Sequence, residues 1–367
     1  GNLGFKTEER DGMLHVTAPS WRSTGDISLP DDILEEVARL MGYENFDFIP
    51  PKVILEKPIN QRDLDMERAI REYLAFRCGM QEIFTYPWIE DEYIEASCAD
   101  TGEMLCLSTP PSPEESRLRS TLVPGMIKAV FTNLRYFESF RIFELTQVFA
   151  DKDYHSINDP SEKLPWMARH LCGAFVGEDP RLLFRDAKGV LEHMHRAVHM
   201  EPLGFARISK PLWADDKLWL NVTYNGEPIG CIGLLSLRSA RKAGIKRSMT
   251  VICEIDVEKL VPLASRQNRY SRLPEYPCVD FDLSVVFDEK VTWADIYETA
   301  VKVELVKEVR FIDEYRGPQV GEGKKSVSFR TRIGSDEGTL TSEKIDAVMK
   351  QMIKKMSKKF GGEVRGA

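Results

Sequence analysis

Four acidic residues near the start of the chain have the side-chain types and the spacing of a cation site. Asp32, Glu35 and Glu36 stand at positions i, i+3 and i+4, so on a helix their carboxylates share one face. Asp26 precedes them, and carboxylate oxygens are ligands that Mg²⁺ takes. Three interpretations are open: a magnesium site, an acidic face in solvent near a helix N-terminus, and carboxylates paired for acid–base catalysis, for which no nucleophile or base lies nearby in sequence.

A short amphipathic helix is predicted to position these carboxylates. Ser28 and Asp31 have the spacing of an N-cap and its capping-box partner, and Pro30 is tolerated in a first turn. Gly42 is predicted to end the helix. Apolar residues at helical spacing are predicted to form its buried face: Ile33, Leu34, Val37, Leu40 and Met41.

The other candidate motifs for chemistry are weak. His193, His195 and His199 fall on one predicted helix, but no H-E-x-x-H signature accompanies them. The sequence contains no P-loop, no G-x-G-x-x-G element and no G-x-S-x-G elbow. None of these motifs therefore identifies a catalytic residue in this chain.

Basic residues gather near the C-terminus, on a helix predicted over 342–360 and on the strand before it. A solvated basic face and a surface that follows an RNA backbone are both open interpretations. The candidate RNA-binding residues are Lys324, Lys325, Arg330, Arg332, Lys350, Lys354 and Lys358.

Composition indicates an ordinary globular protein of two or three domains. The chain has 367 residues and a net charge of −8, which as a whole does not indicate nucleic-acid binding. Its seven cysteines include no C-x-x-C pair, which favours reduced thiols and a cytoplasmic location. No apolar run is long enough for a membrane span, so we expect no membrane association. The opening residues GNLGF start abruptly, and we expect a fragment of a longer protein.

The predicted elements indicate an α+β fold in three parts. Residues 1–57 hold the acidic helix and a linker, residues 58–265 an antiparallel sheet with helices, and residues 266–367 a β-α-β-β-α order typical of a ferredoxin-like domain. Helices are predicted over 60–78, 126–134, from 186 onward, 293–303 and 342–360. Strands are predicted over 14–18, 82–86, 105–108, 141–145, 148–149, 170–176, 218–222, 229–235, 250–255, 281–287, 306–315 and 326–333, with a loop over 151–165 and a possible last strand at the C-terminus.

Several segments in one order resemble the C-terminal half of the β subunit of bacterial phenylalanyl-tRNA synthetase. The first group, PSWR at 19–22, GDI at 25–27 and DILEEVAR at 32–39, resembles the family's helix-turn-helix-like domain. LRSTLVPG at 118–125 and IFEL at 142–145 resemble its catalytic-like module, and FIDEYRG at 311–317, GKKS at 323–326 and TLT at 339–341 resemble its ferredoxin-fold anticodon-binding domain. The sequence departs from the family where Phe281 precedes Asp282, a place that usually holds arginine.

The resemblance implies a fold and a set of site residues. It implies a partial helix-turn-helix-like domain over 1–57, a class II synthetase-like sheet module without an aminoacylation site over 58–265, and an anticodon-binding domain over 266–367. It also implies Mg²⁺ at four carboxylates, Asp26, Asp32, Glu35 and Glu36.

The function implied is that of a non-catalytic part of phenylalanine-tRNA ligase. In that family the α subunit carries the active site, the holoenzyme uses ATP that this chain would not bind, and the assembly is α2β2. This chain would scaffold the α subunit and bind phenylalanine tRNA. The alternative is a free-standing RNA-binding or scaffold paralogue without synthetase activity.

Overall fold

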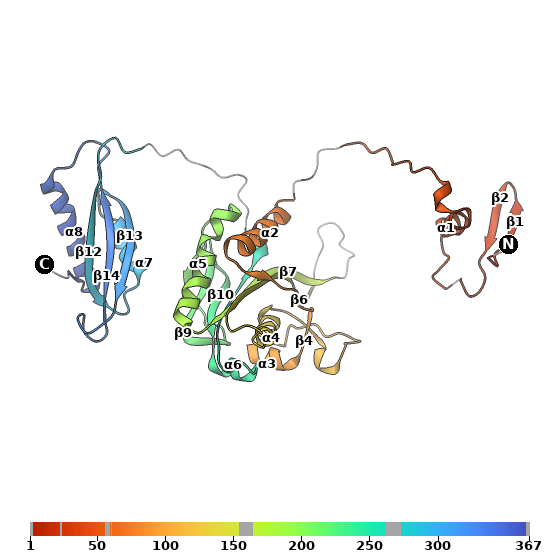
Figure 1. Cartoon of the computed structure of the whole chain (residues 1–367), viewed down its shortest axis with the longest axis horizontal. Helices are drawn as coiled ribbons and strands as arrows, with labels where there is room; N and C mark the ends of the chain where they lie inside the picture. Colours follow the sequence, from red (N-terminus) through yellow and green to blue (C-terminus); the bar gives the residue numbers. More distant parts are fainter. Residues whose placement is uncertain are drawn as a thin grey trace. The chain divides into compact units, whose positions relative to one another are not determined.

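The structure is a computed structural model that describes residues 3–22, 24–55, 59, 61–153, 164–260 and 273–364. The chain divides into two compact units, Gly1–Leu263 and Ala264–Ala367 (Figure 1). Of the helices in these described ranges, none combines the length and apolarity that crossing a bilayer requires.

The first segment is a hairpin followed by one helix. Strands β1 (Lys6–Arg10) and β2 (Met13–Thr17) pair antiparallel, and α1 (Pro30–Met41) ends at Gly42, which has a φ of 82°. A short 3₁₀ turn, η1 (Tyr43–Asn45), follows.

The predicted buried face of α1 is wrong. Leu34 and Leu40 are each 64% exposed, and Val37 and Met41 are also exposed, whereas Glu36 is the buried residue of this helix. An apolar face needs a second layer to cover it, and a two-stranded hairpin supplies too little. The result is an open apolar groove between hairpin and helix, lined by Leu3, Phe5, Thr7, Leu14, Val16, Ile33, Glu36, Val37 and Leu40.

A seven-stranded sheet forms the centre of the first unit. All neighbours pair antiparallel except β3 and β6, which pair parallel. The order is β3 (Gln81–Glu82), β6 (Phe140–Asp153), β7 (Pro165–Gly177), β11 (Met249–Asp256), β10 (Glu227–Leu235), β9 (Ala214–Tyr224) and β8 (Gly204–Ala206).

Helices cover both faces of this sheet and create two apolar layers. One layer packs α2 (Arg62–Glu72), its π-helical extension η2 (Tyr73–Arg77) and α5 (Pro180–Val198) on the sheet. The other packs α3 (Asp91–Ser97), α4 (Val123–Asn133) and α6 (Leu237–Lys242). A small ribbon of β4 (Trp88–Ile89) and β5 (Arg117–Leu118), with the 3₁₀ turns η3 (Pro113–Glu115) and η4 (Val257–Lys259), completes the unit.

The second unit has the predicted ferredoxin-like order. It contains β12 (Val279–Asp288), α7 (Trp293–Val301), β13 (Val306–Tyr315), β14 (Lys324–Ile333), α8 (Ser342–Phe360) and a last short strand β15 (Glu363–Val364). The sheet order is β13-β14-β12-β15. Both helices pack on one face, where Phe287, Phe329 and Met352 are fully buried, and the other face is open.

Some predicted elements have different bounds. The strands at 141–145 and 148–149 are one strand, because β6 pairs with β7 without a break from Phe140 to Ala150. Helix α5 begins at Pro180 rather than 186, because Asp179 caps it by accepting from the backbone N–H of Arg181 at 2.8 Å. The strand at 105–108 reduces to a single bridge at Cys106, and β3 ends at Glu82. Most of the loop predicted over 151–165 lies outside the described residues.

Candidate functional site

An ion-pair network holds two of the four predicted metal ligands. Asp26 accepts from Arg22 Nε at 2.6 Å, and Glu36 accepts from Arg22 Nη2 at 2.8 Å. Glu36 also pairs with Arg39 from the next turn of α1. The Arg22 guanidinium, donating to both carboxylates, holds the pKa of Asp26 and of Glu36 below the usual range.

Asp32 turns toward the N-terminus of α1. Its carboxylate accepts from the backbone N–H groups of Ser28 at 2.6 Å and Leu29 at 2.7 Å. These two donors, Leu29 first, hold the pKa of Asp32 below its usual value. The capping box predicted at Ser28 and Asp31 is wrong: the N-cap is Leu29, whose side chain cannot accept a hydrogen bond, and only the Asp32 half of such a box is present, accepting from Leu29 N–H.

The carboxylates in this arrangement do not fit a magnesium centre. Within the part of the chain that the structure describes, no group of three or more His, Cys, Asp or Glu side chains is placed to hold a metal. The guanidinium of Arg22 lies between Asp26 and Glu36 and supplies the positive charge there. Glu35 is exposed beside them. The assignment of Mg²⁺ to Asp26, Asp32, Glu35 and Glu36 stays a prediction.

The seven predicted RNA-binding cations do not form one surface. Arg330 and Arg332 lie on the open face of the second sheet, where each makes a two-pronged pair with a carboxylate of β12. Arg330 Nε and Nη2 donate to Asp282 at 2.7 and 2.8 Å, and Arg332 donates to Asp280 at 2.8 and 3.1 Å. These guanidinium groups hold the pKa of both aspartates below the usual range.

The predicted lysines fall into two environments. Lys325 is 5% exposed and pairs with Glu314 Oε2 at 3.0 Å, so its role is internal, whereas Lys324 is exposed. On α8 the core takes the opposite side of the helix, and three exposed lysines at intervals of four form a stripe on the outer side, the α8 lysine stripe: Lys350, Lys354 and Lys358.

A buried polar network in the first unit was not predicted. Glu144 of β6 is 1% exposed and accepts from Thr85 N–H at 2.9 Å, from the Thr85 hydroxyl at 2.8 Å and from Arg119 Nη1 at 3.3 Å. Arg119, 4% exposed, also donates to Thr146 Oγ1 at 3.0 Å and to the carbonyl of Gln147 at 2.9 Å. Burial lowers the pKa of Arg119 although Glu144 opposes the shift.

A second buried carboxylate, Glu254 of β11, ties the start of α4 to the sheet. It accepts from Leu122 N–H at 2.7 Å and from the Thr121 hydroxyl at 2.5 Å, and it contacts His170 Nδ1 at 2.9 Å. Burial opposes ionisation of Glu254, but His170 and the two donors hold its pKa below the usual range. Burial likewise opposes the charge on His170, and Glu254 keeps the pKa of His170 raised.

The two networks lie in one row across the sheet. Pairing places Glu144 beside Cys172, Cys172 beside Glu254, and Glu254 beside Cys231. Every carboxylate oxygen of Glu144 and Glu254 already accepts from a protein donor. The sequence carried one signal for this row, since a glutamate interrupts each of two apolar strand runs, IFEL and VICEI.

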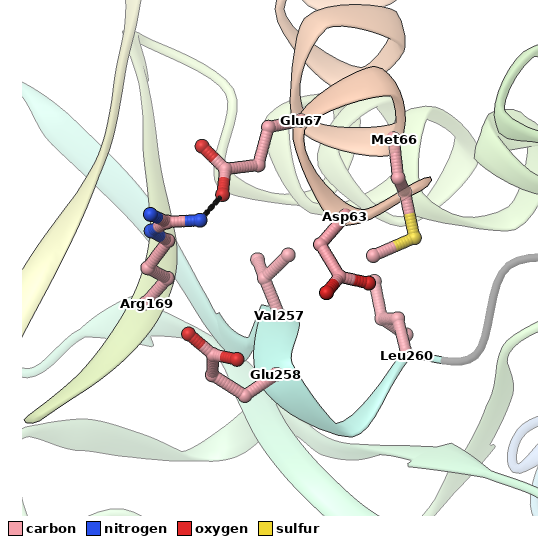
Figure 2. Close-up of a pocket in the computed structure, with 7 residues that line it drawn as sticks. All are labelled: Asp63, Met66, Glu67, Arg169, Val257, Glu258 and Leu260. Carbon is pink, nitrogen blue, oxygen red and sulfur yellow. Dashed lines mark hydrogen bonds and ion pairs between the residues drawn. The ribbon is translucent and has the colours of Figure 1, made fainter. Parts of the chain in front are cut away.

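A small polar pocket lies between α2, β7 and η4. Figure 2 shows the carboxylates of Glu67 and Glu258 on either side of the Arg169 side chain, with Asp63 beyond Val257 in the same pocket. Glu67 is 7% exposed and pairs with Arg169, and it also accepts from Arg71 Nη1 at 3.3 Å. Glu67 is therefore paired inside the pocket, whose lining as a whole has three carboxylates and one guanidinium.

The chain matches three family models in sequence order. Residues 49–257 match the "Phenylalanyl tRNA synthetase beta chain CLM domain", residues 274–365 the "Ferredoxin-fold anticodon binding domain", and residues 1–43 the "tRNA synthetase B5 domain". These ranges hold the seven-stranded sheet unit, the ferredoxin-like unit and the hairpin with α1.

Curated relatives match almost the whole chain. The "Phenylalanine--tRNA ligase beta subunit" of Bacillus licheniformis is 31% identical over 378 residues, which cover 99% of this chain and 45% of the relative. The protein of the same name from Bacillus subtilis is 29% identical over 371 residues, again 99% of this chain and 45% of the relative. The chain thus spans about half the length of these relatives.

Among solved structures, a pyrrolysyl-tRNA synthetase from Desulfitobacterium hafniense is similar to 53% of this chain, covering 66% of its own, with a TM-score of 0.43 and 14% identity. The largest match by family model covers the sheet unit, and the two other matches flank it in the order that the fold presents. The chain belongs to the phenylalanyl-tRNA synthetase beta chain family.

Proposed function

We propose that this chain is the non-catalytic portion of a phenylalanine-tRNA ligase β subunit, which holds the α subunit and binds tRNA for ATP-dependent phenylalanylation. The observation that carries the proposal is the polar row on the seven-stranded sheet. Glu144 and Glu254 use all their oxygens on protein donors, so this face is occupied by structural interactions. This supports the non-catalytic part of the proposal, and the matches to the β-chain family models and relatives support the rest. ATP belongs to the holoenzyme in this proposal and no residue of this chain is assigned to it, while the assignment of Mg²⁺ to Asp26, Asp32, Glu35 and Glu36 stays a prediction.

We place the α subunit at the β3 edge of the sheet. Phe76 and Phe84, on either side of β3, are each 82% exposed, and Tyr86 is exposed as well. β6, the partner of β3, follows a turn in which Tyr136 and Phe137 are exposed. Aromatic side chains gathered on one sheet edge are typical of a protein interface. A second β chain would complete the α2β2 assembly.

We place tRNA on the ferredoxin-like unit. Its open sheet face carries the fixed guanidinium planes of Arg330 and Arg332, and Tyr315 is partly exposed on β13. Unpaired RNA bases stack on aromatic rings and on arginine planes of such sheets. The α8 lysine stripe adds positive potential that attracts phosphates.

The α-subunit contact is tested by co-purification and by restored phenylalanylation. We expect the chain to bind an α subunit, and Phe84→Ser with Tyr86→Ser to abolish binding, because these substitutions remove the apolar anchors. Leu212→Ser is the matched control, since Leu212 is 74% exposed and away from β3 in sequence and in sheet order. A chain that binds tRNA but no α subunit would support the free-standing paralogue instead.

The tRNA contact is tested by charge reversal. Lys354→Glu with Lys358→Glu is expected to weaken tRNA binding and to reduce its dependence on salt, because both lysines are exposed. Lys302→Glu with Lys307→Glu on the same unit is the control, since both lysines already pair with carboxylates. Unchanged affinity and salt slope in the α8 variant would remove the stripe from the proposal.

We further propose the three-part division 1–57, 58–265 and 266–367 and a cytoplasmic location. All seven cysteines are free thiols, which supports a reducing compartment.

A further inference from the structure

Positive charge also gathers on the first unit, on α6 and the turn that follows it. Five of the ten residues from 238 to 247 are cations, and all five are exposed. We name them the α6 basic patch: Arg238, Arg241, Lys242, Lys246 and Arg247. The chain as a whole has a net charge of −8, so this local excess is opposite in sign to the rest of the protein.

The backbone under the patch is held firmly. Ser236 caps α6 by accepting from Ser239 N–H at 3.2 Å, and Ser239 is 1% exposed. Ala243 and Ile245 are buried in the layer formed with α3 and α4. Gly244 has a φ of +74°, and a Cβ there would lie 2.9 Å from the Phe131 ring, so the turn packs directly on α4. The cations therefore project from a fixed surface.

Few carboxylates balance this charge. Lys242 pairs with Glu95 of α3, which lies beside α6 (Figure 1), and no other ion pair of the patch occurs among the residues that the structure describes. Arg135 adds a sixth cation nearby, since its guanidinium lies 5.3 Å from the centre of the Phe131 ring on which Gly244 packs.

The chemistry of the patch favours a polyanion with regularly placed phosphates. Three of its five members are arginine, whose planar fork matches a phosphate better than an ammonium group does. Arg238, Arg241 and Lys242 share one face of α6, because they stand at i, i+3 and i+4. The centre of a protein interface needs apolar anchors, and Leu237 is the one large apolar side chain of α6 that is exposed.

We propose that the α6 basic patch binds the phosphodiester backbone of folded RNA, as a second tRNA contact distinct from the ferredoxin-like unit. The proposal rests on the proposed function for the identity of that RNA. The patch binds RNA without sequence specificity, because its side chains interact with phosphates through their charge and not with the edges of the bases.

The test measures binding of the full chain to a phenylalanine tRNA transcript by fluorescence anisotropy, between about 50 and about 200 mM salt. The variant is Arg238→Gln with Arg241→Gln. Its matched control is Arg181→Gln with Arg185→Gln on α5, which changes the net charge equally at exposed arginines on the opposite face of the sheet. A generic RNA duplex is measured in parallel, and so is co-purification with an α subunit.

We expect the patch variant to bind tRNA about tenfold more weakly, and the slope of log affinity against log salt to fall by about 1.5, since each phosphate contact contributes about 0.7 to 0.9. The control variant keeps both values. If patch and control variants weaken binding equally, net charge alone is responsible and the patch is refuted. Unchanged binding in the patch variant refutes it too, while tRNA binding by the ferredoxin-like unit stands.

Two further outcomes separate this inference from the proposed function. If the chain does not bind tRNA, the tRNA part of the proposed function is refuted. Binding to the RNA duplex then tests the α6 basic patch. Weaker duplex binding by the patch variant alone supports the patch, and the absence of such a specific loss refutes it. A patch variant that keeps its RNA affinity but loses the α subunit shows that the patch faces a protein, which overturns the RNA assignment.

Discussion

Replacing Glu254 by leucine tests whether the buried carboxylate holds the sheet and α4 together. The substitution leaves Leu122 N–H, the Thr121 hydroxyl and His170 without their acceptor in a site where Glu254 is 9% exposed. Removing one partner of a buried charged pair costs about 3–5 kcal/mol. Glu254→Gln keeps one acceptor oxygen and loses the charge, which we expect to cost about 1–2 kcal/mol.

The assay is urea unfolding of the chain, followed by tryptophan fluorescence and extrapolated to water. Single domains are stable by about 5–15 kcal/mol, so the leucine variant loses a large fraction of that free energy of unfolding. Glu258→Leu is the matched control, because Glu258 lies four residues further along the chain in η4 and is exposed. A Glu254→Leu protein within about 1 kcal/mol of the parent would refute the reasoning.

Three further predictions follow from the same contacts. Glu254 raises the pKa of His170, so protonated His170 stabilises the fold fully below about pH 6.5, and this stabilisation is lost as pH rises through the folded-state pKa. The difference in unfolding free energy between the parent and His170→Gln should therefore shrink from about pH 6 to about pH 8. Mg²⁺ should leave the melting temperature of the isolated chain unchanged and raise that of Arg22→Ala, in which the carboxylates lose their guanidinium partner; a rise with the parent chain would contradict this. Lys325→Ala should destabilise the second unit by about 1.5 kcal/mol, because it removes the buried donor to Glu314 Oε2 while Arg316 still pairs with Oε1, whereas Lys324→Ala should be neutral in thermal unfolding.

Elements with strong periodicity were predictable from the sequence. Strand β13 and helix α8 have the predicted bounds, because local patterning and the Thr341 cap define them. Strand β6 was divided in two because Thr146 and Gln147 interrupt its apolar run, while the pairing with β7 that keeps it continuous is a tertiary contact.

The sites were less predictable because their partners are distant in sequence. The spacing of Glu35 and Glu36 places them on one helix but says nothing of Arg22, which reaches Glu36 from 14 positions earlier. Thr121 and Glu254 are 133 positions apart, and only the glutamate inside an apolar strand marks the contact. The prediction that the apolar face of α1 is buried was wrong for the same reason, since helical spacing identifies an apolar face but does not show whether another element covers it.

The polar row across the seven-stranded sheet also limits how the chain can misfold. Side chains alternate between the two faces of a strand, so a slip of β11 by one residue would move Glu254 from its three partners into the opposite apolar layer. In that layer the carboxylate would contact apolar side chains such as Leu171 and Phe175, which pack there with Cys253, and it would lose the donors of its present network. A buried charge without a partner is far costlier than a mispaired apolar residue. The polar row thus fixes the register of the strand pairing. Without it, the apolar run of this strand could pair in several alignments, and with it only one alignment keeps the carboxylate paired.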